Sequence, residues 1–311
     1  MLSRYEPIAP EGSLAWLSQP LPKTVRVNTL KADGKSAQAL LAEEGVRCRP
    51  APWHADALLI ESTLEKHSLG NTLAHFLGHI YVQDLASLLP VLALEPHLSV
   101  DQPILDACAA PGSKTGQLAA ALRNQGAIVA NDASWQRVKA LKGNIERLGV
   151  LNTAITNLDL RRFPAHEFPA ILLDVPCSSE GTLRKRVHST RPQRTPQPAA
   201  LAALQKQLLR KAFALLAPGG TLIYSTCTLA PEENELVVAD LLATEPAARV
   251  EPFQLENVPL APGITEWGRA LPAELADTRR LWPGPQWGGF FLAKIQKEDE
   301  TGRRPAGLRQ G

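Results

Sequence analysis

The sequence lacks the features that would place it in several common protein classes. Its four cysteines, at positions 48, 108, 177 and 227, include no C-x-x-C pair. This argues against a disulfide framework or a zinc site and favours a reduced, cytoplasmic protein. The first residues contain no hydrophobic signal region. No apolar run approaches the ~18 residues of a membrane span. We therefore expect no membrane partner, no metal, and a monomer.

The chain also has almost no net charge. Its 33 Lys and Arg side chains are balanced by 31 Asp and Glu, leaving +2, which is too little to identify a nucleic-acid partner. Residues 1–80 nevertheless hold a group of basic residues with few acids nearby, namely Lys23, Arg26, Lys31, Lys35, Arg47 and Arg49. A solvated basic face and an RNA-docking face both explain this group.

The pattern of apolar and turn residues divides the chain into two domains and a tail. Residues 1–80 are typical of a small α/β domain, with strands at 24–30 and 58–61 and a helix at 36–44. Residues 81–296 form the larger domain, which begins with an apolar helix at 81–94. Residues 297–311 are polar and contain Gly and Pro, so we expect a disordered tail.

The larger domain alternates between strand and helix patterns. The predicted strands are 103–108, 127–132, 153–159, 170–175 and 221–226, and the predicted helices lie near 114–123, 134–148, 199–216 and 232–243. Such alternation predicts a parallel sheet with helices on both faces. Residues 288–295 are predicted to form a last strand at the edge of this sheet.

Two of the predicted strands end in turns that carry a cysteine. Cys177 follows the apolar run 171–175, and Cys227 follows the run 222–226. Ligands of open α/β sheets bind at the carboxyl ends of the strands. Two thiols at that edge indicate chemistry on an electrophilic carbon. The alternative is that both are core residues, because free cysteine is among the most buried residue types.

The turn after the first predicted strand favours a bound nucleotide. Residues 106–115 are small or polar and lead into a helix N-terminus, where free N–H groups bind ligands. Neither the P-loop nor the G-x-G-x-x-G pattern is present. Asp132, which ends the next strand, suits ribose hydroxyls, and Asp159 suits an adenine edge. Each could instead cap a helix or a turn, but Asp132, Asp159 and Asp174 end successive strands and would face one crevice.

Four motifs make the sequence resemble the Nop/Sun family of S-adenosylmethionine-dependent RNA cytosine-5 methyltransferases. They are DACAAPGSKT at 106–115, LDVPCS at 173–178, GTLRK at 181–185, and YSTCT at 224–228 followed by PEENE at 231–235. The resemblance implies an α/β fold, a Rossmann-like class I methyltransferase with a mostly parallel seven-stranded sheet after a small RNA-contacting domain. It also implies S-adenosyl-L-methionine as the cofactor. The implied cofactor residues are Cys108, Ala109, Ala110, Pro111, Gly112, Ser113, Lys114, Asp132, Arg137, Asp159 and Asp174.

The resemblance also assigns different roles to the two thiols, which the residues alone leave equivalent. Cys227 would add to carbon 6 of cytosine, which activates carbon 5 toward methylation, and Cys177 would help to release the product. Asp174 would hydrogen-bond the N3 and amino edge of the base. Lys114 is a plausible cation for lowering a thiol pKa. The RNA, ribosomal or transfer, would contact Arg184, Lys185 and Arg186 in the long basic connection 178–198.

Two alternatives stay open. One is a catalytically silent RNA-binding or assembly factor built on the same fold. The other is a DNA cytosine-5 methyltransferase, which would attack with the Pro-Cys thiol and use a Glu-Asn-Val motif. Glu256, Asn257 and Val258 supply those residue types. That motif belongs after the strand that follows the Pro-Cys strand, where Ser225, Thr226 and Cys227 stand, so we interpret Glu256 as a coincidence.

Overall fold

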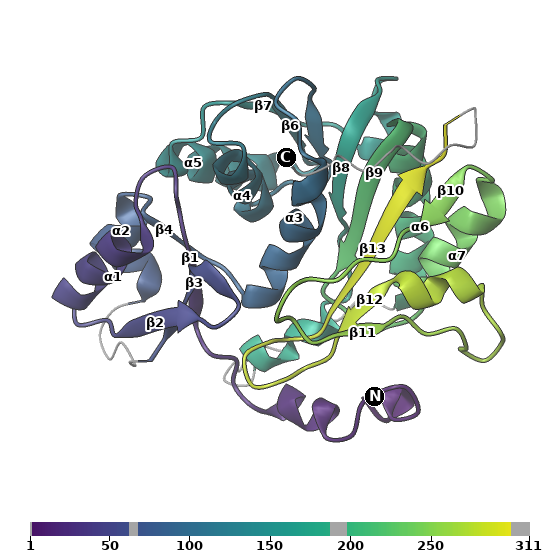
Figure 1. The fold of residues 1–311 in the computed structure, drawn as a ribbon, viewed down its shortest axis with the longest axis horizontal. Coiled ribbons are helices and arrows are strands. Elements are labelled where there is room, and N and C mark those ends of the chain that lie inside the picture. Colours follow the sequence, from purple (N-terminus) through teal and green to yellow (C-terminus); the bar gives the residue numbers. More distant parts are fainter. Residues whose placement is uncertain (1, 62–67, 187–197, 300–311) are drawn as a thin grey trace.

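The computed structural model describes residues 2–61, 68–186 and 198–299, which form two sheets with helices around them (Figure 1). The α-helices are α1 (Gly34–Glu43), α2 (Leu73–Phe76), α3 (Leu89–Leu94), α4 (Ser113–Ala121), α5 (Trp135–Leu148), α6 (Pro198–Ala214) and α7 (Glu235–Thr244). The 3-10 helices are η1 (Leu2–Tyr5), η2 (Ser13–Ser18), η3 (Leu69–Asn71), η4 (Leu85–Leu88), η5 (Glu95–His97), η6 (Leu160–Arg162), η7 (Glu180–Arg186) and η8 (Ala273–Asp277).

The large sheet contains nine strands in the order β11-β12-β13-β9-β8-β5-β6-β7, with β10 also paired to β13. Their bounds are β5 (Ile104–Asp106), β6 (Ile128–Asn131), β7 (Thr153–Thr156), β8 (Phe168–Asp174), β9 (Leu216–Thr226), β10 (Ala248–Val250), β11 (Leu260–Pro262), β12 (Arg279–Leu281) and β13 (Phe290–Lys297). Strands β5 to β9 are parallel, and β13 runs antiparallel to β9. This arrangement is the Rossmann-like sheet that the sequence predicts.

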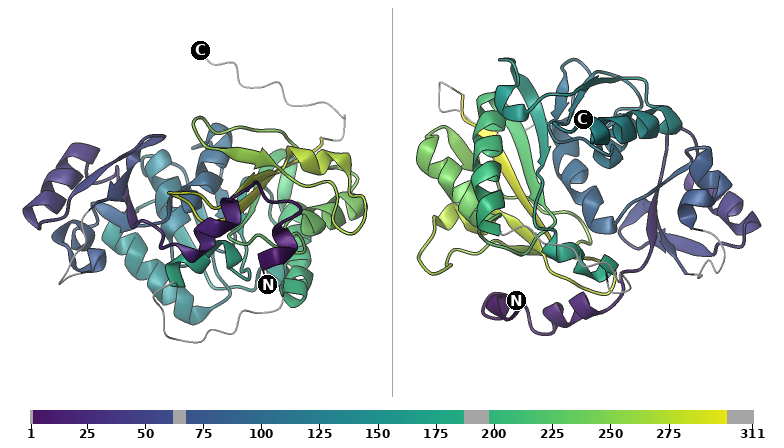
Figure 2. Two further views of the ribbon diagram at one scale, coloured as in Figure 1. Left: turned by 90° about the horizontal axis from the view of Figure 1, so that it is seen from below. Right: turned by 180° about the vertical axis from the view of Figure 1, so that it is seen from behind.

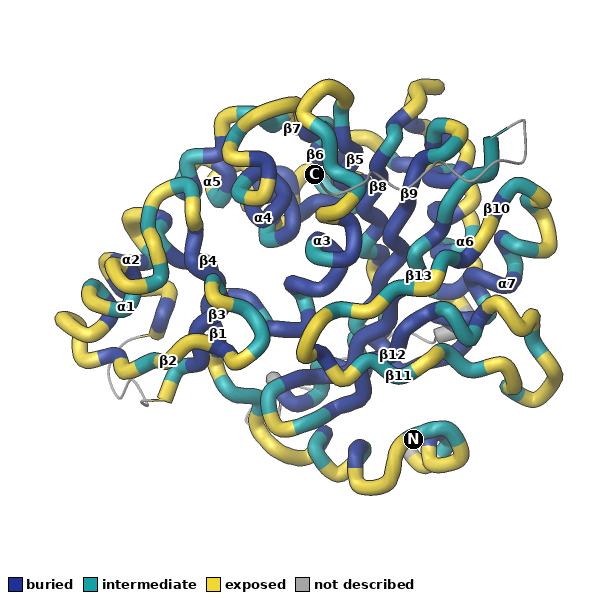
Figure 3. Tube along the Cα trace, viewed as in Figure 1, coloured by how far each residue is buried: buried dark blue, intermediate teal, exposed yellow. Residues whose placement is uncertain are grey.

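Helices cover both faces of the large sheet. Helices α3 and α4 lie on one side of β8 and β9, and α6 and α7 lie on the other (Figures 1 and 2). Each face has its own core of buried apolar side chains. Figure 3 shows β8 and β9 as buried along most of their length. Because these strands are covered on both faces, they read as continuous apolar runs in the sequence.

The small sheet is antiparallel, with the order β2-β3-β1-β4. Its strands are β1 (Thr24–Val27), β2 (Cys48–Ala51), β3 (His54–Ile60) and β4 (Ile80–Val82). Helix α1 begins with a capping box, in which Asp33 accepts from the backbone of Ser36. Strand β4 extends this sheet past residue 80, so the chain enters the larger domain after Val82.

The N-terminal segment runs beneath the large sheet rather than joining the small one (Figure 1). Tyr5 and Leu17 form a buried cluster with Leu229 and Trp282. Tyr5 is fully buried. Residues 2–18 are therefore packed on the larger domain, although the small domain separates them from it in the sequence.

Four sequence predictions differ from the structure. Residues 81–94 do not form one helix, because Tyr81 and Val82 pair in β4 and Pro90 restricts α3 to a start at Leu89. The last strand, β13, is not at an edge, since β12 and β10 pair with it. The sheet has nine strands rather than seven, because the short strands β10, β11 and β12 join the six strands β5 to β9 and β13. The predicted tail begins inside β13, and residues 300–311 lie outside the described residues.

Candidate active site

The loop between β5 and α4 forms one wall of the candidate site. Gly112 has a φ of 105°, and a Cβ at this position would lie 2.9 Å from Leu141 Cδ1. Both the backbone conformation and the close approach of α5 therefore favour glycine here. Asp106 is fully buried and accepts a hydrogen bond from Thr115 Oγ1 at 2.7 Å. Burial raises the pKa of Asp106 to about 7.

Asp132 fixes this loop against the end of β6. Its Oδ2 accepts a hydrogen bond from Ala110 N at 3.3 Å, and its Oδ1 accepts one from Ser134 N at 2.9 Å. Arg137 Nη1 lies 3.4 Å from Asp132 Oδ2, and the same guanidinium donates to the carbonyl oxygen of Ala110. Asp132 therefore stabilises the loop between β5 and α4. Its carboxylate oxygens keep lone pairs that can accept further hydrogen bonds.

A cavity of about 160 Å³ opens beside Asp132. Cys108, Arg137 and Asp159 line it together with Asp132. Asp159 also begins η6, where it accepts from Arg161 N at 3.0 Å and lies 2.6 Å from Arg161 Nη2. The structure thus brings together four of the predicted cofactor residues, three that follow the ends of neighbouring strands and Arg137 from α5.

An ion pair between Lys114 and Asp174 occupies the middle of the site. Lys114 Nζ lies 2.5 Å from Asp174 Oδ2 and 3.2 Å from Ser87 Oγ. Ser225 Oγ donates to the other carboxylate oxygen of Asp174 at 2.8 Å. Burial opposes the charge of Lys114, but the attraction of Asp174 outweighs it and raises the pKa of Lys114. Lys114 therefore stays protonated beside Asp174.

The thiols of Cys177 and Cys227 lie 3.3 Å apart. Ser179 Oγ is 3.4 Å from Cys227 Sγ. The hydrogen bond from Cys177 lowers the pKa of Cys227 against the opposing effect of burial, and Ser179 and the charge of Lys114 lower it further. The same bond, together with burial, raises the pKa of Cys177. Cys227 is therefore the thiol that ionises first.

Buried polar contacts hold the two cysteine-bearing turns together. Gly181 N donates to the carbonyl oxygen of Cys227 at 3.0 Å. Thr228 Oγ1 lies 3.4 Å from Glu180 Oε2, and the hydroxyl of Tyr5 donates to the same carboxylate oxygen. Because Glu180 is buried, these donors keep its carboxylate satisfied. The N-terminal segment therefore contributes directly to the support of both cysteine turns.

The structure corrects the prediction that Arg184 contacts RNA. Arg184 is 2% exposed, and its guanidinium donates to backbone carbonyl oxygens of Gln19, Pro20, Gly284, Pro285 and Trp287. A guanidinium with these partners is not available to a phosphate. The side chains of Lys185 and Arg186, and residues 187–197 of the predicted basic connection, lie outside what the structure describes.

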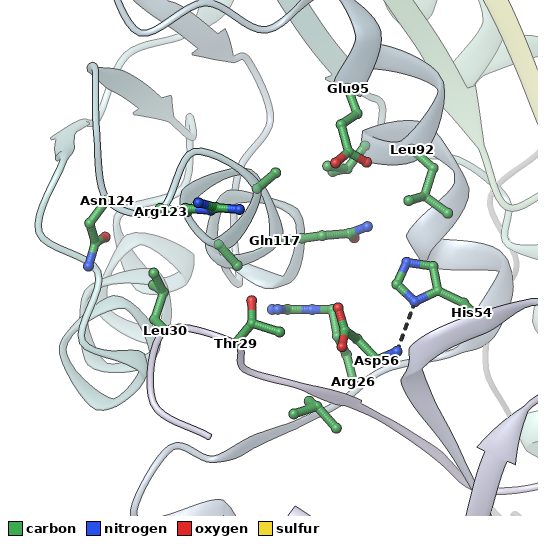
Figure 4. Close-up of a pocket in the computed structure, with 14 residues that line it drawn as sticks. Arg26, Thr29, Leu30, His54, Asp56, Leu92, Glu95, Gln117, Arg123 and Asn124 are labelled. Carbon is green, nitrogen blue, oxygen red and sulfur yellow. Dashed lines mark hydrogen bonds between the residues drawn. The ribbon is translucent and has the colours of Figure 1, made fainter. Parts of the chain in front are cut away.

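One member of the basic group of the small domain, Arg26, does not lie at the surface. Arg26 is buried and donates from Nε to Gln83 Oε1 at 3.1 Å, and burial lowers the pKa of Arg26 to about 10. It lines a cavity of about 650 Å³ between the small sheet and helices α3 and α4. Figure 4 shows Arg26, Asp56 and Gln117 converging on this cavity. Arg26 therefore belongs to neither the solvated face nor the docking face predicted for this group.

The Glu-Asn-Val sequence follows β10 rather than β9, the strand after the Pro-Cys strand. Glu256 is exposed in the connection between β10 and β11. The position beside Asp174 at the end of β9 is held by Ser225. This agrees with the interpretation of Glu256 as a coincidence.

Several residues around the site were missed by the sequence analysis. Ser179 and Glu180 lie two and three positions after Cys177, so their nearness to this motif could have identified them. Ser87 and Tyr5 carried no such signal, because contacts distant in the sequence bring them to the site. Among the described residues, no cluster of His, Cys, Asp and Glu suits a metal ion. No helix in the described ranges is long and apolar enough to cross a membrane.

Comparison with known proteins identifies the family. Residues 91–296 match the family described as 16S rRNA methyltransferase RsmB/F. The chain belongs to the RsmB/F methyltransferase family. Residues 11–66 match the ferredoxin-like domain of RsmF/B-like methyltransferases. The predicted resemblance to Nop/Sun methyltransferases and the predicted Rossmann-like class are therefore confirmed.

Relatives within the RsmB/F family are similar over most of this chain. The chain is 41% identical over 306 residues to the ribosomal RNA small subunit methyltransferase F of Cronobacter sakazakii, covering 96% of this chain and 62% of that protein. It is 43% identical over 291 residues to the protein of the same name from Citrobacter koseri, covering 91% and 59%. The chain thus spans about three fifths of the length of these relatives.

Solved structures show the same fold. A methyltransferase homolog protein from Pyrococcus horikoshii is 34% identical, with a TM-score of 0.77 over 91% of this chain and 88% of that one. NSun6 from the same organism, solved with SFG, has a TM-score of 0.76 over 92% and 94% of the two chains at 24% identity. At 24% identity, the similarity to NSun6 supports the fold alone.

Proposed function

We propose that this chain transfers a methyl group from S-adenosylmethionine to carbon 5 of a cytosine in 16S ribosomal RNA, through a covalent bond between Cys227 and the base. The observation that carries this proposal is the pair of thiols 3.3 Å apart, beside the ion pair of Lys114 and Asp174. Membership of a 16S rRNA methyltransferase family supports the choice of RNA. A silent assembly factor has no need of a thiol with a lowered pKa.

The residues beside the thiols fit S-adenosylmethionine. The φ of 105° at Gly112 lets the loop turn tightly into α4, and the carboxylates of Asp132 and Asp159 line the adjoining cavity. Carboxylates at the ends of successive strands suit ribose hydroxyls and an adenine edge. When bound, S-adenosylmethionine supplies an electrophilic methyl group. We assign Asp132 to the ribose, Asp159 to the adenine, and the backbone of residues 108–114 to the methionine side.

Cys227 is the nucleophile in this proposal. The hydrogen bond from Cys177 lowers the pKa of Cys227 and so favours its thiolate form. The thiolate adds to carbon 6 of cytosine, and the electrons of the C5–C6 double bond then make carbon 5 nucleophilic. The carboxylate of Asp174 accepts a hydrogen bond from the amino group of the base, and from N3 when that nitrogen is protonated in the adduct. Lys114, paired with Asp174, places positive charge where the ring becomes electron-rich.

Cys177 assists the release of the methylated base. After methylation, a water molecule takes the proton from carbon 5, the electron pair of that C–H bond forms the C5–C6 double bond again, and the bond between Cys227 Sγ and carbon 6 breaks. Cys227 leaves as a thiolate. The protonated thiol of Cys177 lies 3.3 Å away and stabilises that thiolate by the hydrogen bond that lowers its pKa. Cys177 therefore supplies the donor that stabilises Cys227 as it leaves carbon 6.

The proposed activity is tested by methyl transfer from radiolabelled S-adenosylmethionine. The acceptors are 16S rRNA transcripts and small ribosomal subunits from a strain that lacks the gene. We expect label in 16S rRNA, in a single nucleotide that bisulfite sequencing identifies as 5-methylcytosine. Label in no RNA, with the cofactor bound normally, would overturn the proposal.

A further inference from the structure

A groove opens at the protein surface beside the reaction centre. Its walls come from three parts of the chain: residues 20–24 before β1, residues 81–87 around β4 and η4, and the loop at Pro111 and Ser113. Its volume is about 740 Å³. Ser87 lines its inner end and lies 3.2 Å from Lys114 Nζ, which contacts Asp174. We call this feature the entrance groove.

The walls of the entrance groove are apolar near the surface. Pro20 and Pro111 are exposed, and Pro22 is half-buried. Val82 is 43% exposed although it is a strand residue. Apolar surfaces such as these can pack against the faces of bases, which are exposed in single-stranded RNA.

The charges of the entrance groove also favour RNA. Lys23 is exposed at the groove, and among the described residues it forms no ion pair. Arg184 also lines the groove, but its guanidinium already donates to backbone carbonyl oxygens. Asp84 is the acidic residue of the groove, and it directly precedes η4. Lys23 is thus the cation in this groove that can contact a phosphate.

We propose that the entrance groove binds the single-stranded RNA segment that carries the target cytosine. Lys23 contacts a phosphate, and Val82 packs with Pro22 and Pro111 against the base that adjoins the cytosine. The cytosine itself passes Ser87 to reach Cys227. This inference rests on the proposed function and extends it, because it makes the small domain, through Lys23 and Val82, a part of the substrate site.

Two substitutions separate the two kinds of contact. Lys23→Gln removes one charge, and Val82→Ser removes apolar surface without changing charge. The matched controls are Lys139→Gln, an exposed lysine on α5 outside the groove, and Leu151→Ser, an exposed leucine outside it. Binding of a 16S rRNA transcript is measured at several salt concentrations, together with KM and kcat for methyl transfer and the affinity for S-adenosylmethionine.

We expect both groove variants to raise the KM for RNA about fivefold or more, with unchanged cofactor affinity and melting temperature. Lys23→Gln lowers the slope of log affinity against log salt by about 0.7, the value for one phosphate of a single strand. Val82→Ser leaves that slope unchanged. Both controls behave as the parent protein.

Two negative results have different meanings. If the parent protein methylates 16S rRNA but both groove variants retain its KM and salt slope, the entrance groove does not bind RNA and the proposed function stands. If the parent protein binds S-adenosylmethionine but methylates no RNA, the proposed function fails and the groove assignment fails with it.

Discussion

The Sγ atoms of Cys177 and Cys227 lie 3.3 Å apart, although 50 positions separate the two residues in the chain. Parallel pairing of β8 with β9 brings the two strand ends to the same edge of the sheet. At this distance one thiol stabilises the ionised form of the other, so two residues of the same type acquire different pKa values. The different pKa values are the physical basis of the different roles proposed for the two thiols.

The pH dependence of alkylation tests the different pKa values of the two thiols. Iodoacetamide reacts with thiolates, so Cys227 should react at lower pH than Cys177. In Cys177→Ala the hydrogen bond to Cys227 is absent, so the pKa of Cys227 rises and its alkylation curve moves to higher pH. Mass spectrometry of the labelled peptides gives both curves. An unchanged Cys227 curve in Cys177→Ala would contradict the coupling.

Tyr5 is expected to act as a positioning residue for the nucleophile. Its hydroxyl donates to Glu180, which contacts Thr228 next to Cys227. Tyr5→Phe keeps the ring and its packing near Trp267 but leaves a buried carboxylate short of a donor, at a cost of about 1.5–3 kcal/mol. We predict a severalfold lower kcat, an unchanged KM for RNA, and a shifted alkylation curve for Cys227. A loss of thermal stability with no change in that curve would indicate a structural role only.

Asp132 should contribute strongly to cofactor affinity. Asp132→Asn keeps the shape of the side chain but removes the charge, and hydrogen bonds to charged groups contribute about 1.5–3 kcal/mol. We therefore predict at least tenfold weaker binding of S-adenosylmethionine by calorimetry. Asp101→Asn, an exposed residue in the turn before β5, is the control and should bind normally. Equal affinity of both variants would remove Asp132 from the cofactor site.

Arg184 should matter for stability rather than for RNA binding. Arg184→Met keeps an apolar stem but leaves several buried carbonyl oxygens without donors, so we predict a loss of about 2–4 kcal/mol in the free energy of unfolding. The exposed Arg162→Met is the control. Urea unfolding measures both. A stable Arg184→Met with weakened RNA binding would restore the original prediction for this residue.

The candidate site could be predicted in large part because it lies at strand ends. Long apolar runs identify β8 and β9, and parallel strands bring Asp174, Cys177 and Cys227 to one edge. The same rule places Asp132 and Asp159 beside a common cavity. The distinct roles of the two thiols could not be obtained from the strand pattern, since they depend on a hydrogen bond across two turns.

The errors arise from contacts between distant segments and from very short strands. Arg184 looked like part of a solvated basic loop, but carbonyl groups around Gln19 and Trp287 enclose it. No local pattern signals such a partner. Strands β10, β11 and β12 have three residues each, which is too short for alternation to be recognised. They nevertheless change the position of β13 from the edge to the interior.

The covalent intermediate is the central claim, and trapping it is the most direct test. Cys177→Ala, Cys227→Ala and the double variant are incubated with 16S rRNA transcript and S-adenosylmethionine, treated with nuclease, and analysed by denaturing gel and mass spectrometry. We predict that Cys177→Ala accumulates a nucleotide adduct on Cys227, and that both variants without Cys227 form none. An adduct in Cys227→Ala, carried by Cys177, would contradict the assigned roles.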